Sequence, residues 1–138
     1  MNNTSKKEYD ILLVEDNPDD VFLTKLAIEK SDINGEVTVA NNGKAAVELL
    51  ENLTTNEKKL PDLILLDINL PKMNGLEALE NIKSAKATKS IPIVIFTSSD
   101  SESDMNYCYG SGVDLYIRKP NNINDLKKIM IYINNHLA

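Results

Sequence analysis

The sequence predicts an α/β fold, in which a doubly wound parallel sheet of five strands carries helices on both faces. Three observations favour this fold class. The chain has 138 residues, 42% of them hydrophobic, which suits one domain with a packed core. Five short apolar runs alternate with amphipathic stretches. Three of the runs are nearly continuous in Ile, Leu and Val, as is typical of parallel strands buried on both faces.

The apolar runs are the predicted strands, and they follow one another at intervals that leave room for a helix between each pair. Right-handed crossovers would then place all five in one parallel sheet, although the spacing does not determine their order. None of the runs is long enough to span a membrane. The predicted strands are Tyr9–Val14, Glu36–Ala40, Leu63–Leu66, Ile91–Phe96 and Val113–Ile117.

The first helix has the clearest start signal in the sequence. Asn17 is a suitable N-cap residue, Pro18 fits the first helical position, and the two acids that follow suit the positive end of the helix dipole. The apolar stripe of this helix is predicted to contain Phe22, Leu23, Leu26 and Ala27.

Four further helices are predicted from apolar residues at helical spacing. The third helix opens near Gly75, the fourth begins after Asp100 or Ser101 and ends at Gly110–Gly112, and the last begins at Asn121 or Asn122. The apolar positions are Ala46, Leu49, Leu50 and Leu53 in the second helix, Leu76, Leu79 and Ile82 in the third, Met105, Cys108 and Tyr109 in the fourth, and Ile123, Leu126, Met130, Ile133 and Leu137 in the last.

The overall composition restricts the class of protein. A net charge of −6 and a pI near 4.8 argue against general attraction to nucleic acid or to an anionic membrane. The N-terminus lacks an apolar signal segment, so we expect a cytoplasmic protein. Cys108, the one cysteine, is expected to be a packing residue, and His136, the one histidine, a solvated residue near the C-terminus.

Polar and charged residues follow four of the five predicted strands. Glu15 and Asp16 follow the first strand, Asp67 the third, Thr97 the fourth, and Lys119 comes just after the fifth. In open parallel sheets, ligands bind outside the carboxyl ends of the strands. The sequence therefore predicts a site at that edge, built from three carboxylates, a hydroxyl and an ammonium.

Each of these residues has a simpler interpretation when taken alone. Glu15 and Asp16 are also suitable as helix-capping acids, Lys119 as a loop lysine, and Thr97 as a hydroxyl at a strand end. Asp67 is harder to explain in this way, because it directly follows four apolar residues and an unpaired buried charge is very costly.

The combination favours phosphoryl transfer. Crowded carboxylates without His or Cys form an oxygen-only donor set, which suits a hard cation such as Mg²⁺. An aspartate can act as a nucleophile on phosphorus, and the reaction depends on positioning and charge neutralisation. Lys119 and Mg²⁺ would neutralise the phosphoryl oxygens, and Thr97 would donate a hydrogen bond to one of them.

The chain resembles the receiver domain of two-component response regulators. The resemblance covers residues 8–137, within a predicted single receiver domain of residues 1–138 that has no output domain. It implies a flavodoxin-like (βα)5 fold with strand order 2-1-3-4-5. The residues that carry it are Leu13–Asn17, Leu65–Gly75 with its Asp67-Ile68-Asn69-Leu70-Pro71 segment, Phe96–Ser99 and Tyr116–Pro120.

The resemblance also implies a role for each site residue. Asp67 would accept the phosphoryl group from a histidine kinase phosphohistidine, and Lys119 would pair with that group. The Mg²⁺ ligands would be Asp16, Asp67 and the backbone carbonyl of Asn69, with Glu15 acting through water. The peptide bond between Lys119 and Pro120 is commonly cis in this family.

Thr97 and Tyr116 match the two switch positions of the family, although Tyr116 is also consistent with simple strand packing. The partners implied are a histidine kinase or a phosphotransfer protein and an unidentified downstream protein, with neither DNA nor a membrane. The face of the last two helices and the fifth strand is the usual contact surface, and a homodimer through it is consistent with the family. Tyr107, Ile131 and Tyr132 would be either exposed on that face or part of the core.

Two features depart from the commonest receiver pattern. The stretch Glu51–Leu60 lengthens the link before the third strand, and together with Asn17-Pro18-Asp19-Asp20 it is similar to stand-alone regulators that partner phytochrome-like kinases. Asn69 and Ser99 occupy positions where families vary and where the lifetime of the acyl phosphate is tuned.

Two alternative functions agree less well with these residues. A haloacid-dehalogenase-like phosphatase would need an acid in place of Asn69. A pseudo-receiver that binds partners without phosphorylation would not need the complete acidic site. The expectation is therefore a signalling phosphoacceptor that is not an enzyme in the usual sense. The sequence does not identify its kinase, stimulus or target.

Overall fold

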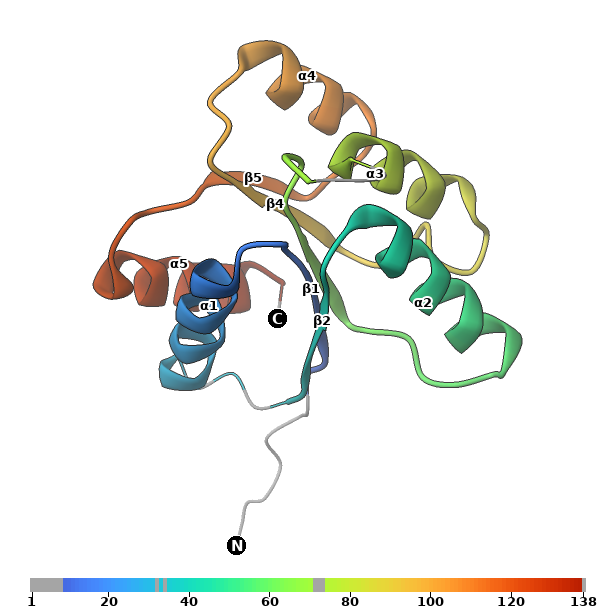
Figure 1. Cartoon of the computed structure of the whole chain (residues 1–138), viewed down its shortest axis with the longest axis horizontal. Coiled ribbons are helices and arrows are strands. Elements are labelled where there is room, and N and C mark those ends of the chain that lie inside the picture. The colour runs from blue at the N-terminus through green and yellow to red at the C-terminus, as the bar shows by residue number, and fades with distance from the viewer. Residues whose placement is uncertain (1–8, 32, 34, 71–73, 138) are drawn as a thin grey trace, which may run out of the picture.

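The computed structural model describes residues 9–31, 33, 35–70 and 74–137, and the predicted alternation of strands and helices is confirmed (Figure 1). The strands differ from the prediction only by small shifts at their ends. The elements are β1 (Ile11–Val14), α1 (Pro18–Lys30), β2 (Val37–Ala40), α2 (Gly43–Thr55), β3 (Leu63–Leu66), α3 (Gly75–Ser84), β4 (Ile93–Thr97), α4 (Glu102–Gly110), β5 (Leu115–Arg118) and α5 (Ile123–Leu137).

All five strands are parallel and lie in the order β2-β1-β3-β4-β5, as the resemblance implied. Val14, the last residue of β1, lies beside Ala40 of β2 and Leu66 of β3. The carboxyl ends of the central strands are therefore level with one another, and the residues that follow them meet at one edge. The order reverses at β1, so the crevice at that edge opens beside β1 and β3.

The helices form two layers around the sheet (Figure 1). Helices α1 and α5 lie together on one face, while α2, α3 and α4 lie on the other. Alternate residues of β1 point to opposite layers: Ile11 and Leu13 join the core under α1 and α5, and Leu12 and Val14 join the core under α2 and α3. Both faces of the central strands are thus buried, which explains why their sequences are apolar throughout.

The start of α1 follows the prediction, but its buried face does not. The Asn17 side chain accepts hydrogen bonds from the N–H groups of Asp19 (2.9 Å) and Asp20 (3.1 Å), as expected of an N-cap. Phe22 was predicted to lie in the apolar stripe, but it is 66% exposed. The buried positions of α1 are Thr24, Ala27 and Ile28, and α5 packs against this helix.

Helices α2 and α4 end with the same backbone pattern, in which two N–H groups beyond the cap donate back to carbonyls of the last turn. The bonds are Glu57 N to Thr54 O (3.2 Å) and Lys58 N to Leu53 O (2.9 Å) after α2, and Gly112 N to Tyr109 O (3.1 Å) and Val113 N to Cys108 O (3.3 Å) after α4. The pattern requires a left-handed residue, which is Gly112 (φ 92°) after α4 but Glu57 (φ 53°) after α2. Helix α2 therefore ends with a strained side-chain-bearing residue.

The stretch Glu51–Leu60 is divided between helix and loop. Helix α2 continues to Thr55, so the first half of the Glu51–Leu60 stretch is helical. In the part of the chain that the structure describes, no helix is both long and apolar enough to cross a membrane.

Candidate functional site

Asp67 lies buried at the end of β3, and both of its carboxylate oxygens are engaged. Its N–H donates to the Val14 carbonyl (3.1 Å), which holds the residue against β1. Oδ1 accepts hydrogen bonds from the Thr97 hydroxyl (2.7 Å) and the Asn69 N–H (2.9 Å), and Oδ2 accepts one from Lys119 Nζ (2.8 Å). A buried charge is tolerated here because it is paired and hydrogen-bonded.

Lys119 reaches the site from the end of β5, where its N–H donates to the Thr97 carbonyl (2.7 Å). Its ammonium group donates to Glu15, to Asp20 (3.1 Å) and to Asp67. Burial alone would lower the pKa of Lys119, but the hydrogen bonds and charges of Asp67 and Glu15 outweigh it and raise the pKa above its usual value. Lys119 is therefore a permanent positive charge at the centre of the site.

The expectation of a cis peptide bond before Pro120 was wrong, because that bond is trans in this structure.

Glu15, Asp16 and Asp67 form an acidic cluster. One carboxylate oxygen from each lies within 4.8 Å of the others. Glu15 is buried, and burial raises its pKa, because the desolvation of the carboxylate outweighs the ion pair with Lys119. Asp16 is exposed. An oxygen-only cluster with one solvent-facing member has the donor chemistry of a hard divalent cation that keeps water ligands, so the residues present fit Mg²⁺.

The two predicted switch residues are connected through Ser99. The Ser99 N–H donates to the Thr97 hydroxyl oxygen (3.3 Å), and the Tyr116 hydroxyl donates to the Ser99 carbonyl (3.1 Å). The Tyr116 ring also packs against the core under α2 and α3. Tyr116 is therefore both a packing residue and a hydrogen-bonding partner of the loop that follows Thr97.

Sequence reasoning missed Asp20 as a member of this site, having assigned it to the helix dipole alone. Its place in the first turn of α1 does not distinguish it from Asp19 in the sequence, and only the contact with Lys119 does so. Glu15, Asp20 and Asp67 all contact the Lys119 ammonium group, and Asp16 lies beside two of them, so four carboxylates share the site with one ammonium group and negative charge is in excess.

Gly75 closes the acceptor loop at its base. Its N–H donates to the Ile68 carbonyl (3.2 Å), and a Cβ atom at this position would lie 2.3 Å from the Asp67 carbonyl oxygen and from Ile68 Cα. Only glycine allows this approach of α3 to the end of β3. Pro71, which belongs to the motif that carries the resemblance, lies outside the described residues.

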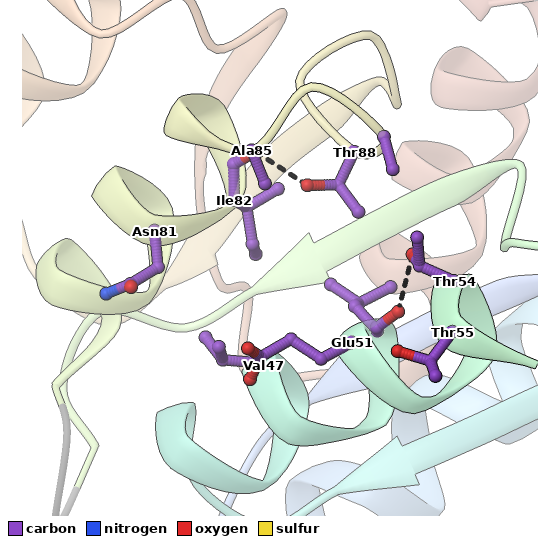
Figure 2. A pocket seen from close by; sticks show the side chains of 10 residues that line it. Val47, Glu51, Thr54, Thr55, Asn81, Ile82, Ala85 and Thr88 are labelled. Carbon is purple, nitrogen blue, oxygen red and sulfur yellow. Dashed lines mark hydrogen bonds between the residues drawn. The ribbon is translucent and has the colours of Figure 1, made fainter.

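A separate groove between α2 and α3, with a volume of about 260 Å³, lies away from these residues (Figure 2). Figure 2 shows that two of its hydroxyl groups already have partners: Thr54 donates to the Leu50 carbonyl (2.8 Å) and Thr88 to the Ile82 carbonyl (2.7 Å). The groove contains none of the residues that follow the strands, and the strand-end cluster remains the candidate.

The remaining residues discussed from the sequence lie outside the strand-end cluster. Cys108 is fully buried, and burial raises the pKa of its thiol to about 11, so it is a packing residue as expected. His136 is exposed and stacks against Tyr132. Tyr107, Ile131 and Tyr132 are exposed rather than part of the core.

The model of the response regulator receiver domain matches residues 11–131. The chain belongs to the response regulator receiver domain family. The order of the strands and the four strand ends of the site agree with this assignment.

Two curated relatives illustrate what this receiver domain is similar to. The response regulator Rcp1 of a Synechocystis strain is 37% identical over 131 residues, which cover 94% of this chain and 89% of Rcp1. The probable methanogenesis regulatory protein FilR2 of Methanothrix harundinacea is 37% identical over 118 residues, which cover 86% of this chain and 76% of FilR2. The receiver domain described here is thus a signalling protein of the two-component class.

Solved structures give the same result. The phosphorylated cyanobacterial phytochrome response regulator RcpA is 36% identical with a TM-score of 0.86, and the match covers 95% of this chain and 94% of RcpA. The Mn²⁺-bound form of Rcp1 is 36% identical with a TM-score of 0.80, and the match covers 92% of each chain. The acidic cluster of this receiver domain has the donor set of a divalent metal site.

Proposed function

We propose that this chain is a phosphorylation-driven switch, in which Asp67 accepts a phosphoryl group from the phosphohistidine of a histidine kinase or phosphotransfer protein. One observation carries the proposal: a buried carboxylate has a lysine on one oxygen and a hydroxyl on the other, beside two further carboxylates. In the described residues, no other group of three Asp, Glu, His or Cys side chains lies close enough together to hold a metal ion.

In this mechanism, an Asp67 oxygen forms the bond to phosphorus while the P–N bond of the donor breaks, and its electron pair stays on the imidazole nitrogen. Lys119 Nζ already lies 2.8 Å from the Asp67 carboxylate. It can therefore pair with the phosphoryl oxygens without a large movement of its side chain. The Thr97 hydroxyl would transfer its hydrogen bond from Asp67 to a phosphoryl oxygen. No general acid or base is required, and turnover is limited to the protein's own phosphorylation and dephosphorylation.

Mg²⁺ is the proposed cation, held by Asp16, Asp67 and the Asn69 carbonyl, with Glu15 acting through water. When bound, the ion would neutralise charge that develops on the phosphoryl oxygens. The excess of carboxylates over ammonium groups gives the site the affinity for a cation that this role requires. The Mn²⁺-bound form of Rcp1 supports a divalent ion at this site. Mg²⁺ in particular is proposed because the donor atoms are all oxygens.

The switch itself would shift the population between two arrangements of Thr97 and Tyr116, and a partner would recognise one of them. The face formed by α4, β5 and α5 is the proposed contact surface, for a downstream protein or a second copy of the chain. The likeness to RcpA, a phytochrome response regulator, supports a phytochrome-like kinase as the phosphoryl donor. The single-domain organisation and cytoplasmic location stay predictions.

The test compares three full-length proteins by intact mass and by NMR, with Mg²⁺ and either acetyl phosphate or beryllofluoride. Wild type should gain one phosphoryl group in acetyl phosphate and show Mg²⁺-dependent shifts in beryllofluoride. Asp67→Asn should do neither. Asp62→Asn is the matched control, because Asp62 directly precedes β3 as Asp67 directly follows it, and it should behave as wild type.

Equal modification of Asp67→Asn and wild type would show that the acceptor is elsewhere. No Mg²⁺-dependent change in wild type would overturn the proposed function as a whole.

A further inference from the structure

Tyr109 makes a contact that neither the sequence patterns nor the proposed mechanism accounts for. It lies near the end of α4, its side chain is 48% exposed, and its hydroxyl oxygen accepts a hydrogen bond from the backbone N–H of Tyr116 (3.2 Å). Tyr116 is one of the two proposed switch residues. A side chain of α4 therefore holds the backbone of the switch residue directly.

The N–H of Tyr116 has no strand to pair with, because β5 is an edge strand of the sheet. The direction of N–H groups alternates along a strand. The N–H of Lys119 points toward β4 and donates to the Thr97 carbonyl (2.7 Å). Tyr116 lies three residues earlier, so its N–H points to the other side, away from β4. Tyr109 supplies the acceptor that a neighbouring strand would otherwise provide.

This contact completes a continuous chain of hydrogen bonds from the phosphoacceptor to the surface. Thr97 donates to Asp67, Ser99 donates to Thr97, and Tyr116 donates to Ser99 through its hydroxyl group. Tyr116 then donates to Tyr109 through its backbone. Each neighbouring pair is joined by one bond between 2.7 and 3.3 Å.

Helix α4 is well placed to respond, because side-chain packing holds it only weakly. Cys108 is its single fully buried residue. Polar contacts hold the rest: Ser99 donates to Asp104 near the start of the helix (3.0 Å), and Tyr107 donates to Glu80 of α3 (3.2 Å). Tyr116 is thus bonded to the loop before α4 and to the last part of α4 at the same time.

We propose that Tyr109 is a positioning residue of the switch, whose hydroxyl stabilises the arrangement in which Tyr116 is bonded to Ser99 and thereby couples the end of α4 to Asp67. The proposal rests on the proposed function, since it assigns a further residue to the regulation of the same site. The hydroxyl contributes to this arrangement only while Tyr116 occupies it, so its loss shifts the equilibrium away from it.

The test uses Tyr109→Phe, which removes one hydroxyl group from an exposed side chain. Tyr107→Phe is the matched control, because Tyr107 is an exposed tyrosine of the same helix whose hydroxyl contacts Glu80 instead of the switch. Beryllofluoride is titrated with Mg²⁺ into each full-length protein, and the amide signals of Ser99 and Tyr116 are followed by NMR. The beryllofluoride concentration that gives half of the change should shift by about two- to fivefold in Tyr109→Phe, as expected for the loss of one neutral hydrogen bond, and should stay at the wild-type value in Tyr107→Phe.

A second measurement separates coupling from simple stabilisation. The amide of Tyr116 should exchange with solvent more slowly than that of Arg118, whose N–H also faces outward, and the difference should disappear in Tyr109→Phe. A lower stability of Tyr109→Phe with an unchanged beryllofluoride midpoint would overturn the proposal and leave Tyr109 as an edge cap. A wild-type protein that does not respond to beryllofluoride would instead overturn the proposed function, which the wild-type titration reports by itself.

Discussion

Within the described residues, Lys59 and Lys119 each contact more than one carboxylate, and the two side chains differ in burial. Lys59 donates to Asp10 (2.8 Å) and Asp62 (3.0 Å), but its side chain is 59% exposed, so water and salt screen both contacts. Lys119 makes similar contacts with a side chain that is only 10% exposed. The same chemistry is therefore a surface contact at one end of β3 and the electrostatic centre of the site at the other.

The raised pKa of Glu15 predicts how the stability of the Mg²⁺-free protein depends on pH. The folded state holds the proton of Glu15 more tightly than the unfolded state, so this residue favours folding most below its unfolded pKa of 4.5. That contribution is lost as the pH rises through the folded pKa. In urea unfolding, Glu15→Gln should therefore gain stability relative to wild type as the pH is raised from 4 to 7.

Glu48→Gln, a change of an exposed glutamate on α2, serves as the control and should show no such trend. A constant difference between Glu15→Gln and wild type across this range would contradict the prediction. Saturating Mg²⁺ should reverse it, because a bound cation favours the charged carboxylate.

Most of the candidate site could be predicted because its residues directly follow the strands. The apolar runs and the rule that ligands bind at the carboxyl ends of parallel strands were enough to find five of its residues. These are Glu15, Asp16, Asp67, Thr97 and Lys119. Their individual functional roles stay predictions. Asp20 and Tyr109 could not be found in this way, because their contacts depend on side chains that reach across from helices.

At the scale of elements, the last turns of α2 and α4 differ only in the residue that takes the left-handed conformation. A side chain in this region costs about 1–2 kcal/mol relative to glycine. Glu57→Gly should therefore stabilise the protein by about 0.5–1 kcal/mol, once the greater freedom of glycine in the unfolded chain is subtracted. Urea unfolding with an unchanged m-value would measure this gain.

Gly112→Ala is the reciprocal change and should destabilise the protein by about 1 kcal/mol. A Cβ atom there meets only the end of the Lys83 side chain, at 4.0 Å, so the cost would come from the backbone and not from a clash. If both substitutions changed stability in the same direction, backbone strain would not be the cause.

The helix starts were predictable where the signal is local, as with the N-cap at Asn17. The buried face of α1 was not, because hydrophobicity selected Phe22, which is exposed, and gave no reason to select Thr24, which is buried. That face is selected by the neighbouring helix α5, which lies far away in the sequence. Thr24 is buried, whereas Phe22 lies on the opposite side of α1 and is exposed.

At the scale of the whole molecule, the order of the strands is a property of non-local pairing. The apolar runs specify that five strands form, but each run would fit several places in a parallel sheet. The correct order followed only from the resemblance carried by Asp67 and the other strand-end motifs. The same order assembles an excess of negative charge at one edge, so folding and cation binding should be linked.

Mg²⁺ should therefore raise the free energy of unfolding, by about 1.4 kcal/mol when its free concentration is ten times the dissociation constant. Asp16→Asn should lose most of this effect, because Asp16 is the exposed member of the acidic cluster. Asp19→Asn, an exposed acid one turn away, should keep it. The measurement is thermal unfolding in Mg²⁺ against NaCl of equal ionic strength.

Equal effects of Mg²⁺ on Asp16→Asn and on wild type would mean that the ion acts on the net charge of −6 and not at this cluster.

The contact between Gly75 and the end of β3 affects how the protein can change over evolution. Because the backbone closes the acceptor loop at its base, the position of Asp67 is fixed by β1, β4 and α3 together. Changes in the sequence between Asn69 and Asn74 would then leave the Asp67 carboxylate in place. This segment can diverge in descendants of this sequence without displacing Asp67, provided that residue 75 stays glycine.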